Sequence, residues 1–111
     1  MALSKDQILS ARDFKTKEVP VPEWGGDILV RSLDGAGRDK IEAAFLSKET
    51  EGLKAMVVAL TVCDENGKLL FEQADVERLQ AKSAEVLERV FEAAWEISGL
   101  RAGSIEAAEG N

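Results

Sequence analysis

The sequence contains no histidine and no tyrosine, and it has a single cysteine, Cys63. Without histidine there is no imidazole to act as a general base near neutral pH, to activate a serine or cysteine nucleophile, or to bind zinc. Only carboxylates, lysines and one thiol remain for catalysis. We therefore expect that the protein is not an enzyme and has no catalytic residue, no cofactor and no metal site.

Basic residues are also scarce, since 14 Lys and Arg stand against 21 Asp and Glu and give a net charge of −7. Nucleic acids and anionic membranes attract clusters of Lys and Arg, so neither is expected as a partner. No apolar run approaches the roughly 20 residues that cross a membrane. Charged residues interrupt the N-terminal segment, unlike the apolar stretch of a signal peptide, and one cysteine cannot form an internal disulfide. These features predict a soluble, cytoplasmic protein.

The chain is long enough for one compact domain, with 111 residues of which 45% are hydrophobic. We expect this domain to span residues 1–100. The remaining segment, 101–111, is rich in Gly, Ala and Glu and has little to bury, which predicts a mobile tail.

Residues 17–33 carry both prolines of the chain, and apolar and polar residues alternate on either side of a Gly-Gly pair. This pattern predicts a β-hairpin with strands at about 17–22 and 27–33 and a turn at Gly-Gly. Because Pro20 and Pro22 lack backbone N–H donors, the first strand is expected at the edge of its sheet.

The rest of the chain predicts three to four helices, so the expected fold class is α+β and mainly helical. Asp34 is a suitable N-cap for the first main helix. The apolar segment 53–63 fits a buried strand or a buried helix, and its length together with the polar turn before it favours the helix. A short helix is expected around 75–80 and a long amphipathic one over 84–98 with Ser83 as its cap. For residues 4–11, a short amphipathic helix and a frayed segment stay open.

The run at 64–67 and the single cysteine can each be interpreted either as a functional site or as a purely structural feature. The run DENG at 64–67 resembles the start of a calcium loop but lacks the later ligands, so a tight turn or tiny hairpin is favoured. Cys63, at the end of the apolar segment, is interpreted as a small hydrophobe rather than a reactive thiol.

The candidate contact residues are two tryptophans, a phenylalanine and two glutamates. Trp24 lies beside the hairpin turn, where packing onto the sheet and exposure to a partner stay equally open. The last helix places Phe91 and Trp95 on its apolar face, and Glu88 and Glu92 belong to an acidic stripe with Glu85 and Glu96. The stripe is either a solvated face or an acidic docking surface. Glu85 is also placed to pair with Arg89 at i,i+4.

Three motifs, taken in order, resemble the tail assembly chaperones of long-tailed (siphovirus-type) bacteriophages and prophages. The first is the hairpin VPVPEWGG at 19–26, followed by V-R-x-L-x-G-x-x-R-D at 30–39. The second is the ending VCDENG at 62–67. The third is L-F-x-x-x-D-V-x-x-L at 70–79, leading to a helix that ends in ISGL at 97–100. The resemblance covers about residues 9–100, while the segment SKETEG at 47–52 departs from it.

This resemblance implies a non-enzymatic chaperone with no catalytic residues to transfer. Such chaperones bind the tape measure protein, keep it soluble while tail tube subunits polymerise around it, and are absent from the mature virion. The family also has a long form made by ribosomal frameshifting, which would be a further partner alongside the tail tube protein. A homo-oligomer in the cytoplasm of the bacterial host is expected, with Trp24, Phe91, Trp95, Glu88 and Glu92 as candidate contacts.

Two other classes of protein stay open. One is an acidic adaptor or antitoxin-like protein that binds a basic partner through the glutamate stripe. The other is a structural component of the virion, such as a tail completion or head–tail connector protein.

Overall fold

The structure is a computed structural model and describes residues 1–100 of the chain; the expected mobile tail, 101–111, lies outside the described residues. Its helices and strands are, in chain order, α1 (Lys5–Ser10), β1 (Thr16–Val21), the 3-10 turn η1 (Pro22–Trp24), β2 (Gly26–Arg31), α2 (Gly35–Leu46), α3 (Leu53–Thr61), β3 (Val62–Cys63), the 3-10 turn η2 (Gln73–Asp75), α4 (Val76–Gln80) and α5 (Ala84–Ile97). The predicted α+β, mainly helical fold with an N-terminal hairpin is confirmed. The described residues contain five α-helices rather than three to four, because both short segments, α1 and α4, are helical.

The three strands form an antiparallel sheet in the order β1-β2-β3, so the proline-containing strand is indeed an edge strand. The turn of the hairpin differs from the prediction. It is made by η1 and by Gly25, whose φ of 91° is left-handed, while Gly26 is already the first residue of β2. Pro22 begins η1 because a proline at the first position of a helical turn needs no N–H donor.

The apolar segment predicted as one helix over 53–63 changes structure before its end. Helix α3 stops at Thr61, whose buried hydroxyl donates to the Val57 carbonyl at 2.7 Å. The next two residues are extended and pair with β2, so that Val62 faces Val30 and Cys63 faces Leu29. Cys63 is therefore a strand residue, because pairing with a distant strand outweighs the local helical pattern.

Residues 64–67 form the predicted tight turn. The Asp64 carboxylate accepts hydrogen bonds from the backbone N–H groups of Asn66 at 2.8 Å and Lys68 at 3.0 Å. Gly67 has a φ of 83°, and Cys63 bridges to Leu69 beyond the turn. These hydrogen bonds confirm the tight turn, and the bridge between Cys63 and Leu69 makes it the turn of a very short hairpin. Burial raises the pKa of the Cys63 thiol, which disfavours its reactive thiolate form.

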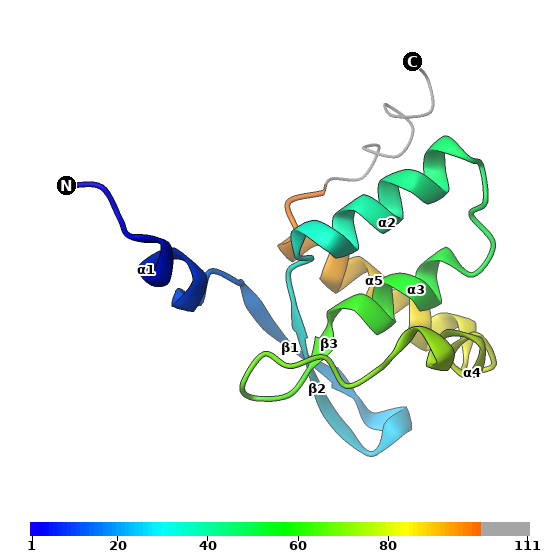
Figure 1. Cartoon of the computed structure of the whole chain (residues 1–111). Coiled ribbons are helices and arrows are strands. Elements are labelled where there is room, and N and C mark those ends of the chain that lie inside the picture. Colours follow the sequence, from blue (N-terminus) through cyan, green and yellow to red (C-terminus); the bar gives the residue numbers. More distant parts are fainter. Residues whose placement is uncertain (101–111) are drawn as a thin grey trace.

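Helix α5 covers one face of the sheet, and α3 packs against α5 (Figure 1). Between them lies the larger of two hydrophobic clusters, whose buried members are Val19, Val21, Val30, Ala55, Val58, Ala59, Val62, Leu79, Val86, Leu87, Val90 and Ala93. The strand residues in this cluster alternate, as expected for a sheet with one covered face. Within residues 1–100, no helix covers the opposite face of the sheet.

The second cluster joins α2 to α3 and α5, and its buried members are Ile41, Ala44, Leu53, Val57, Phe91, Ala94 and Trp95. Helix α2 begins as predicted at Asp34, whose carboxylate accepts from the N–H of Gly37 at 2.7 Å. Ser83 occupies the N-cap position of α5, but its side chain makes no capping hydrogen bond. No helix within residues 1–100 is both long and apolar enough to span a bilayer.

Candidate partner-binding groove

A groove of about 540 Å³ opens where the start of α3, the end of α4 and the first half of α5 meet. Its apolar lining comes from Leu53, Ala55, Leu87 and Phe91. Its polar lining includes Lys54, Glu88, Thr50 and Gln80. Below, "the groove" means this surface. Such an apolar floor with a polar rim suits one face of an amphipathic helix.

Phe91 forms part of the groove floor, and its position is set by aromatic packing. Its ring stacks on Trp95 with centroids 5.1 Å apart, and Phe45 of α2 meets Trp95 edge to face at 6.4 Å. Phe91 and Trp95 are each only 8% exposed. The candidate apolar face of α5 is therefore mainly core, with Phe91 reaching the groove and Trp95 supporting it from behind.

Glu88 stands at the rim of the groove as the ion-pair partner of Lys54. The Lys54 ammonium also lies 5.7 Å from the centre of the Phe91 ring, within the range of a cation–π contact. This pair neutralises the rim locally, so Glu88 is not a free member of the acidic stripe. The sequence did not assign a role to Lys54, although it is the one charged residue in the apolar segment 53–63.

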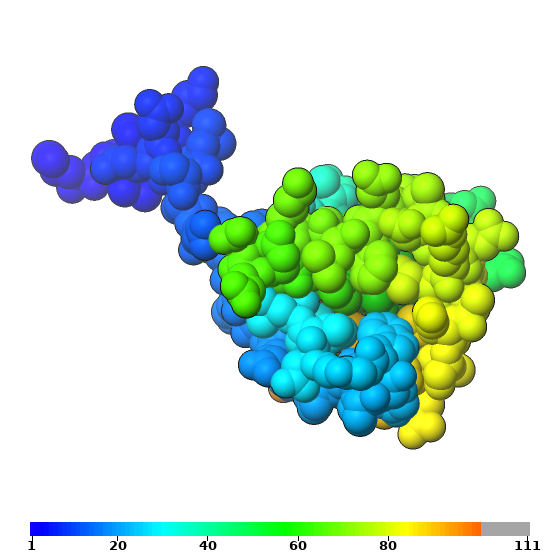
Figure 2. Space-filling model, turned by 90° about the horizontal axis from the view of Figure 1, so that it is seen from below, coloured from blue at the N-terminus to red at the C-terminus, as the bar shows by residue number. Residues whose placement is uncertain are grey.

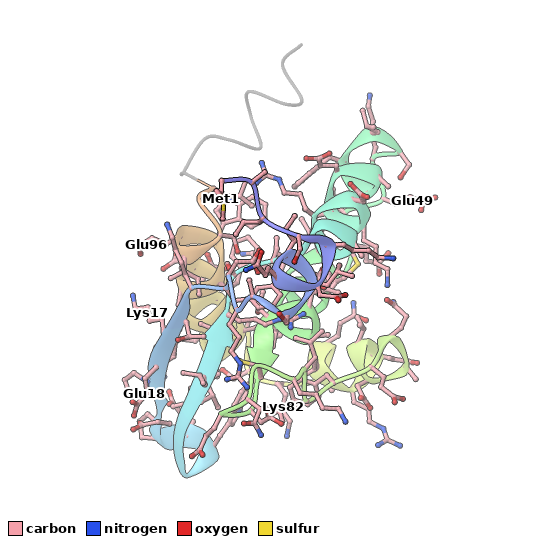
Figure 3. All side chains as sticks on the ribbon, turned by 60° about the vertical axis from the view of Figure 1, so that its left-hand side comes forward. Met1, Lys17, Glu18, Glu49, Lys82 and Glu96 are labelled. Atoms are coloured by element: carbon pink, nitrogen blue, oxygen red, sulfur yellow. The ribbon has the colours of Figure 1, made fainter. Side chains whose placement is uncertain are left out.

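Glu92 does not line the groove. It is exposed on the outer face of α5 with Glu85 and Glu96, and Figure 3 shows Glu96 projecting from that helix. Among residues 1–100 these three carboxylates make no ion pair within 4 Å. The stripe is thus an exposed acidic face, separate from the groove, and its use as a docking surface stays a prediction.

The predicted pairing of Glu85 with Arg89 is wrong. The Arg89 guanidinium instead binds Glu23 of η1 in a bidentate contact, with distances of 2.8 and 2.7 Å. A planar fork that meets a carboxylate with two parallel hydrogen bonds is stronger than a surface i,i+4 pair. The hydrogen bond from Arg89 lowers the pKa of Glu23 to about 2.

This contact joins the hairpin tip to α5 beside Trp24. The Trp24 side chain is half-buried and packs against the first hydrophobic cluster. It does not line the groove. Of the two alternatives left open by the sequence for Trp24, packing onto the core is the one observed. The five candidate residues therefore do not form one site. Only Phe91 and Glu88 line the groove together, and Trp95 stacks on Phe91 from behind.

The described residues contain no group of three or more His, Cys, Asp or Glu side chains placed to hold a metal ion. The polar side chains that line the groove are Thr50, Lys54, Gln80 and Glu88, and of these Lys54 and Glu88 are paired with each other.

The architecture defines a class of protein, a small α+β domain in which an N-terminal hairpin packs on a helical layer. No protein-family model matches the sequence, and no curated protein matches it. Among solved structures, the chain is similar to the tail assembly chaperone of bacteriophage HK97, with a TM-score of 0.66. The match covers 87% of this chain and 95% of that chain at 19% sequence identity. The resemblance indicated by the sequence motifs is thereby confirmed at the level of the fold.

Proposed function

We propose that this protein is a non-enzymatic tail assembly chaperone of a long-tailed bacteriophage or prophage, which binds the tape measure protein and keeps it soluble during assembly of the tail tube. The observation that carries the proposal is the common fold with the HK97 tail assembly chaperone over nearly the whole of both chains. The order of the three sequence motifs supports it independently, because it depends on the sequence and not on the fold.

The groove supplies a surface for such a partner. A tape measure protein is expected to be long, helical and partly apolar, and an amphipathic helix binds an apolar groove through side chains spaced by three and four residues. The groove floor of Leu53, Leu87 and Phe91 offers the apolar contact. The neutral Lys54–Glu88 pair at the rim adds no net charge that would repel it.

The acidic exterior supports a solubilising role. A net charge of −7 and the solvated face of Glu85, Glu92 and Glu96 make loaded complexes repel one another. In this proposal the protein acts in the cytoplasm of the host, self-associates along the tape measure and leaves before the virion is complete. The frameshifted long form and the tail tube protein are its further proposed partners.

The test is co-expression of the full chain with the tape measure protein encoded by the same phage or prophage, scoring the soluble fraction of the tape measure. The groove variant is Thr50→Glu with Gln80→Glu, which places two charges at the groove mouth on exposed positions. Its matched control makes the same two changes elsewhere, Thr16→Glu with Gln73→Glu, also on exposed positions.

The unaltered chain and the control are expected to keep the tape measure soluble, and the groove variant is expected to leave it insoluble. If the tape measure is equally insoluble with and without the unaltered chain, the proposed function is wrong. If both variants solubilise it equally, the function stands and the groove is not the binding surface. Recovery of the protein in purified virions would favour a structural component over a chaperone.

A further inference from the structure

Residues 1–12 form an arm that stands apart from the rest of the described structure. Every residue of this arm is exposed, including Leu3 at 67%, Ile8 at 57% and Leu9 at 72%. Figure 2 shows the arm standing clear of the body of the protein. It nevertheless has ordered local structure, because Ser4 and Gln7 form a complete capping box at the start of α1. Apolar side chains on a folded but unpartnered element indicate an interaction surface.

The base of the arm is fixed to the sheet. The Phe14 ring lies 4.3 Å from the Arg31 guanidinium, and the N–H of Lys15 donates to the Ser32 hydroxyl at 3.1 Å. Between this anchor and α1 the chain is short and Ala11 is extended, with φ of −69° and ψ of 139°. The arm is therefore directed away from its own sheet, as Figure 1 also shows.

A second surface without a partner lies on the outer face of the sheet, the face that carries no helix. A cavity of about 450 Å³ there has Leu29 and Leu70 in its lining, and Leu70 is 55% exposed. Four carboxylates, those of Glu18, Asp27, Asp64 and Glu65, also line it. Below, "the outer-face pocket" means this surface; Figure 3 shows Glu18 projecting from β1.

The charges of the arm and of the outer-face pocket are opposite. The segment 1–15 contains three basic residues and two acidic ones, so it is net positive in a chain whose total charge is −7. The pocket, by contrast, is crowded with like charge: a hydrogen bond to Asp27 and the repulsion of its charge raise the pKa of Glu18. A cation placed beside these carboxylates would relieve that repulsion.

We propose that the arm of one copy docks in the outer-face pocket of a second copy, with Ile8 and Leu9 covering Leu29 and Leu70. Lys5 and Arg12 then face the carboxylates of the rim. Such a contact is heterologous, because the arm and the pocket are different surfaces, so each copy binds one neighbour and is bound by another. The inference names the surface for the self-association in the proposed function. Its test uses this chain alone, so it is judged separately from tape measure binding.

The experiment is sedimentation velocity of the full chain over a range of concentrations, with two charge-reversed variants. The arm variant is Lys5→Glu with Arg12→Glu, and the pocket variant is Asp27→Lys with Glu65→Lys. The unaltered chain is expected to increase in average mass with concentration. Each variant alone is expected to associate at least about tenfold more weakly, because like charges then meet across the contact.

Mixing the two variants is the decisive step. The arm variant keeps a normal pocket and the pocket variant keeps a normal arm, so every arm–pocket contact in an alternating complex is matched again, and association is expected to return. The matched controls move the same charges elsewhere, Lys40→Glu with Lys82→Glu and Glu49→Lys with Glu51→Lys, on exposed positions. They are expected to associate as the unaltered chain does.

A chain that stays monomeric at all concentrations would overturn the proposal. So would an association that the arm and pocket variants weaken no more than the controls do, or a mixture that fails to restore it. A further variant, Ile8→Ser with Leu9→Ser, tests the apolar part of the contact. Because these side chains are mostly exposed within one copy, the variant is expected to lower association with little change in the unfolding midpoint.

Discussion

Replacement of Arg31 by lysine tests whether one buried guanidinium joins three parts of the fold. The Arg31 side chain is only 10% exposed. It donates to the Gly67 carbonyl at 2.8 Å and to the Asp34 carboxylate at 3.2 Å, and its remaining face lies against Phe14. It therefore ties β2 to the 64–67 turn, to the start of α2 and to the base of the arm.

A lysine keeps the charge but has one ammonium in place of a planar fork, so it cannot reach both acceptors in the same geometry. Losing one hydrogen bond from a charged donor costs about 1.5–3 kcal/mol, and weaker stacking on Phe14 costs up to about 0.5 kcal/mol more. Part of this loss is offset, because the Arg31 Nε atom is buried without a hydrogen-bond partner. We expect Arg31→Lys to lower the free energy of unfolding by about 2 kcal/mol.

The assay is urea unfolding followed by circular dichroism and tryptophan fluorescence. With an m-value of about 1–1.5 kcal/mol/M for a chain of this size, the midpoint should fall by roughly 1.5 M with m unchanged. The control is Arg38→Lys, since Arg38 is 48% exposed and pairs with Glu42 on the surface of α2. Its expected effect is below about 0.5 kcal/mol. Equal shifts for the two variants would refute the reasoning.

Two further predictions concern the hairpin tip and the turn before α3. Arg89 lowers the pKa of Glu23 from its ordinary 4.5 to about 2, so the contact stabilises the fold above about pH 4.5, and this stabilisation is lost as the pH falls toward 2. The urea midpoint of Glu23→Gln should therefore fall less between pH 6 and pH 2 than the midpoint of the unaltered chain. An equal fall in the two proteins would contradict the assignment. Gly52 has a φ of 73°, and an added Cβ would lie 2.5 Å from the Gln80 amide nitrogen. Gly52→Ala should cost about 1–2 kcal/mol in thermal unfolding, whereas Gly26→Ala, with open space and no positive φ, should cost nearly nothing.

Local sequence patterns were sufficient for most of the secondary structure. The alternation around the two prolines predicted an edge hairpin, and the Asp34 cap and the 3.6-residue period predicted α2 and α5. These signals are local because each depends on residues within one turn or one strand. The same holds for the 64–67 turn, where the Asp64 carboxylate binds the backbone of its own loop.

The errors arose where a distant part of the chain competes with a local preference. Cys63 belongs to a strand because β2 offers unpaired backbone groups beside it. Arg89 binds Glu23 rather than Glu85 because the hairpin tip folds back onto α5. Sequence spacing on one helix cannot report either of these partners, which are far away along the chain.

The candidate site shows the same division. The composition, with no histidine and an excess of acid, restricts the chemistry of the protein whatever its fold, because it fixes which side chains exist at all. The motif order was enough to indicate a family, since it is a property of the chain. The tertiary structure brings Phe91, Lys54 and Glu88 together around one groove, because α3, α4 and α5 pack against one another there. It places Trp24 elsewhere, against the first hydrophobic cluster. A groove consists of surfaces from several elements, so it exists only after those elements have met.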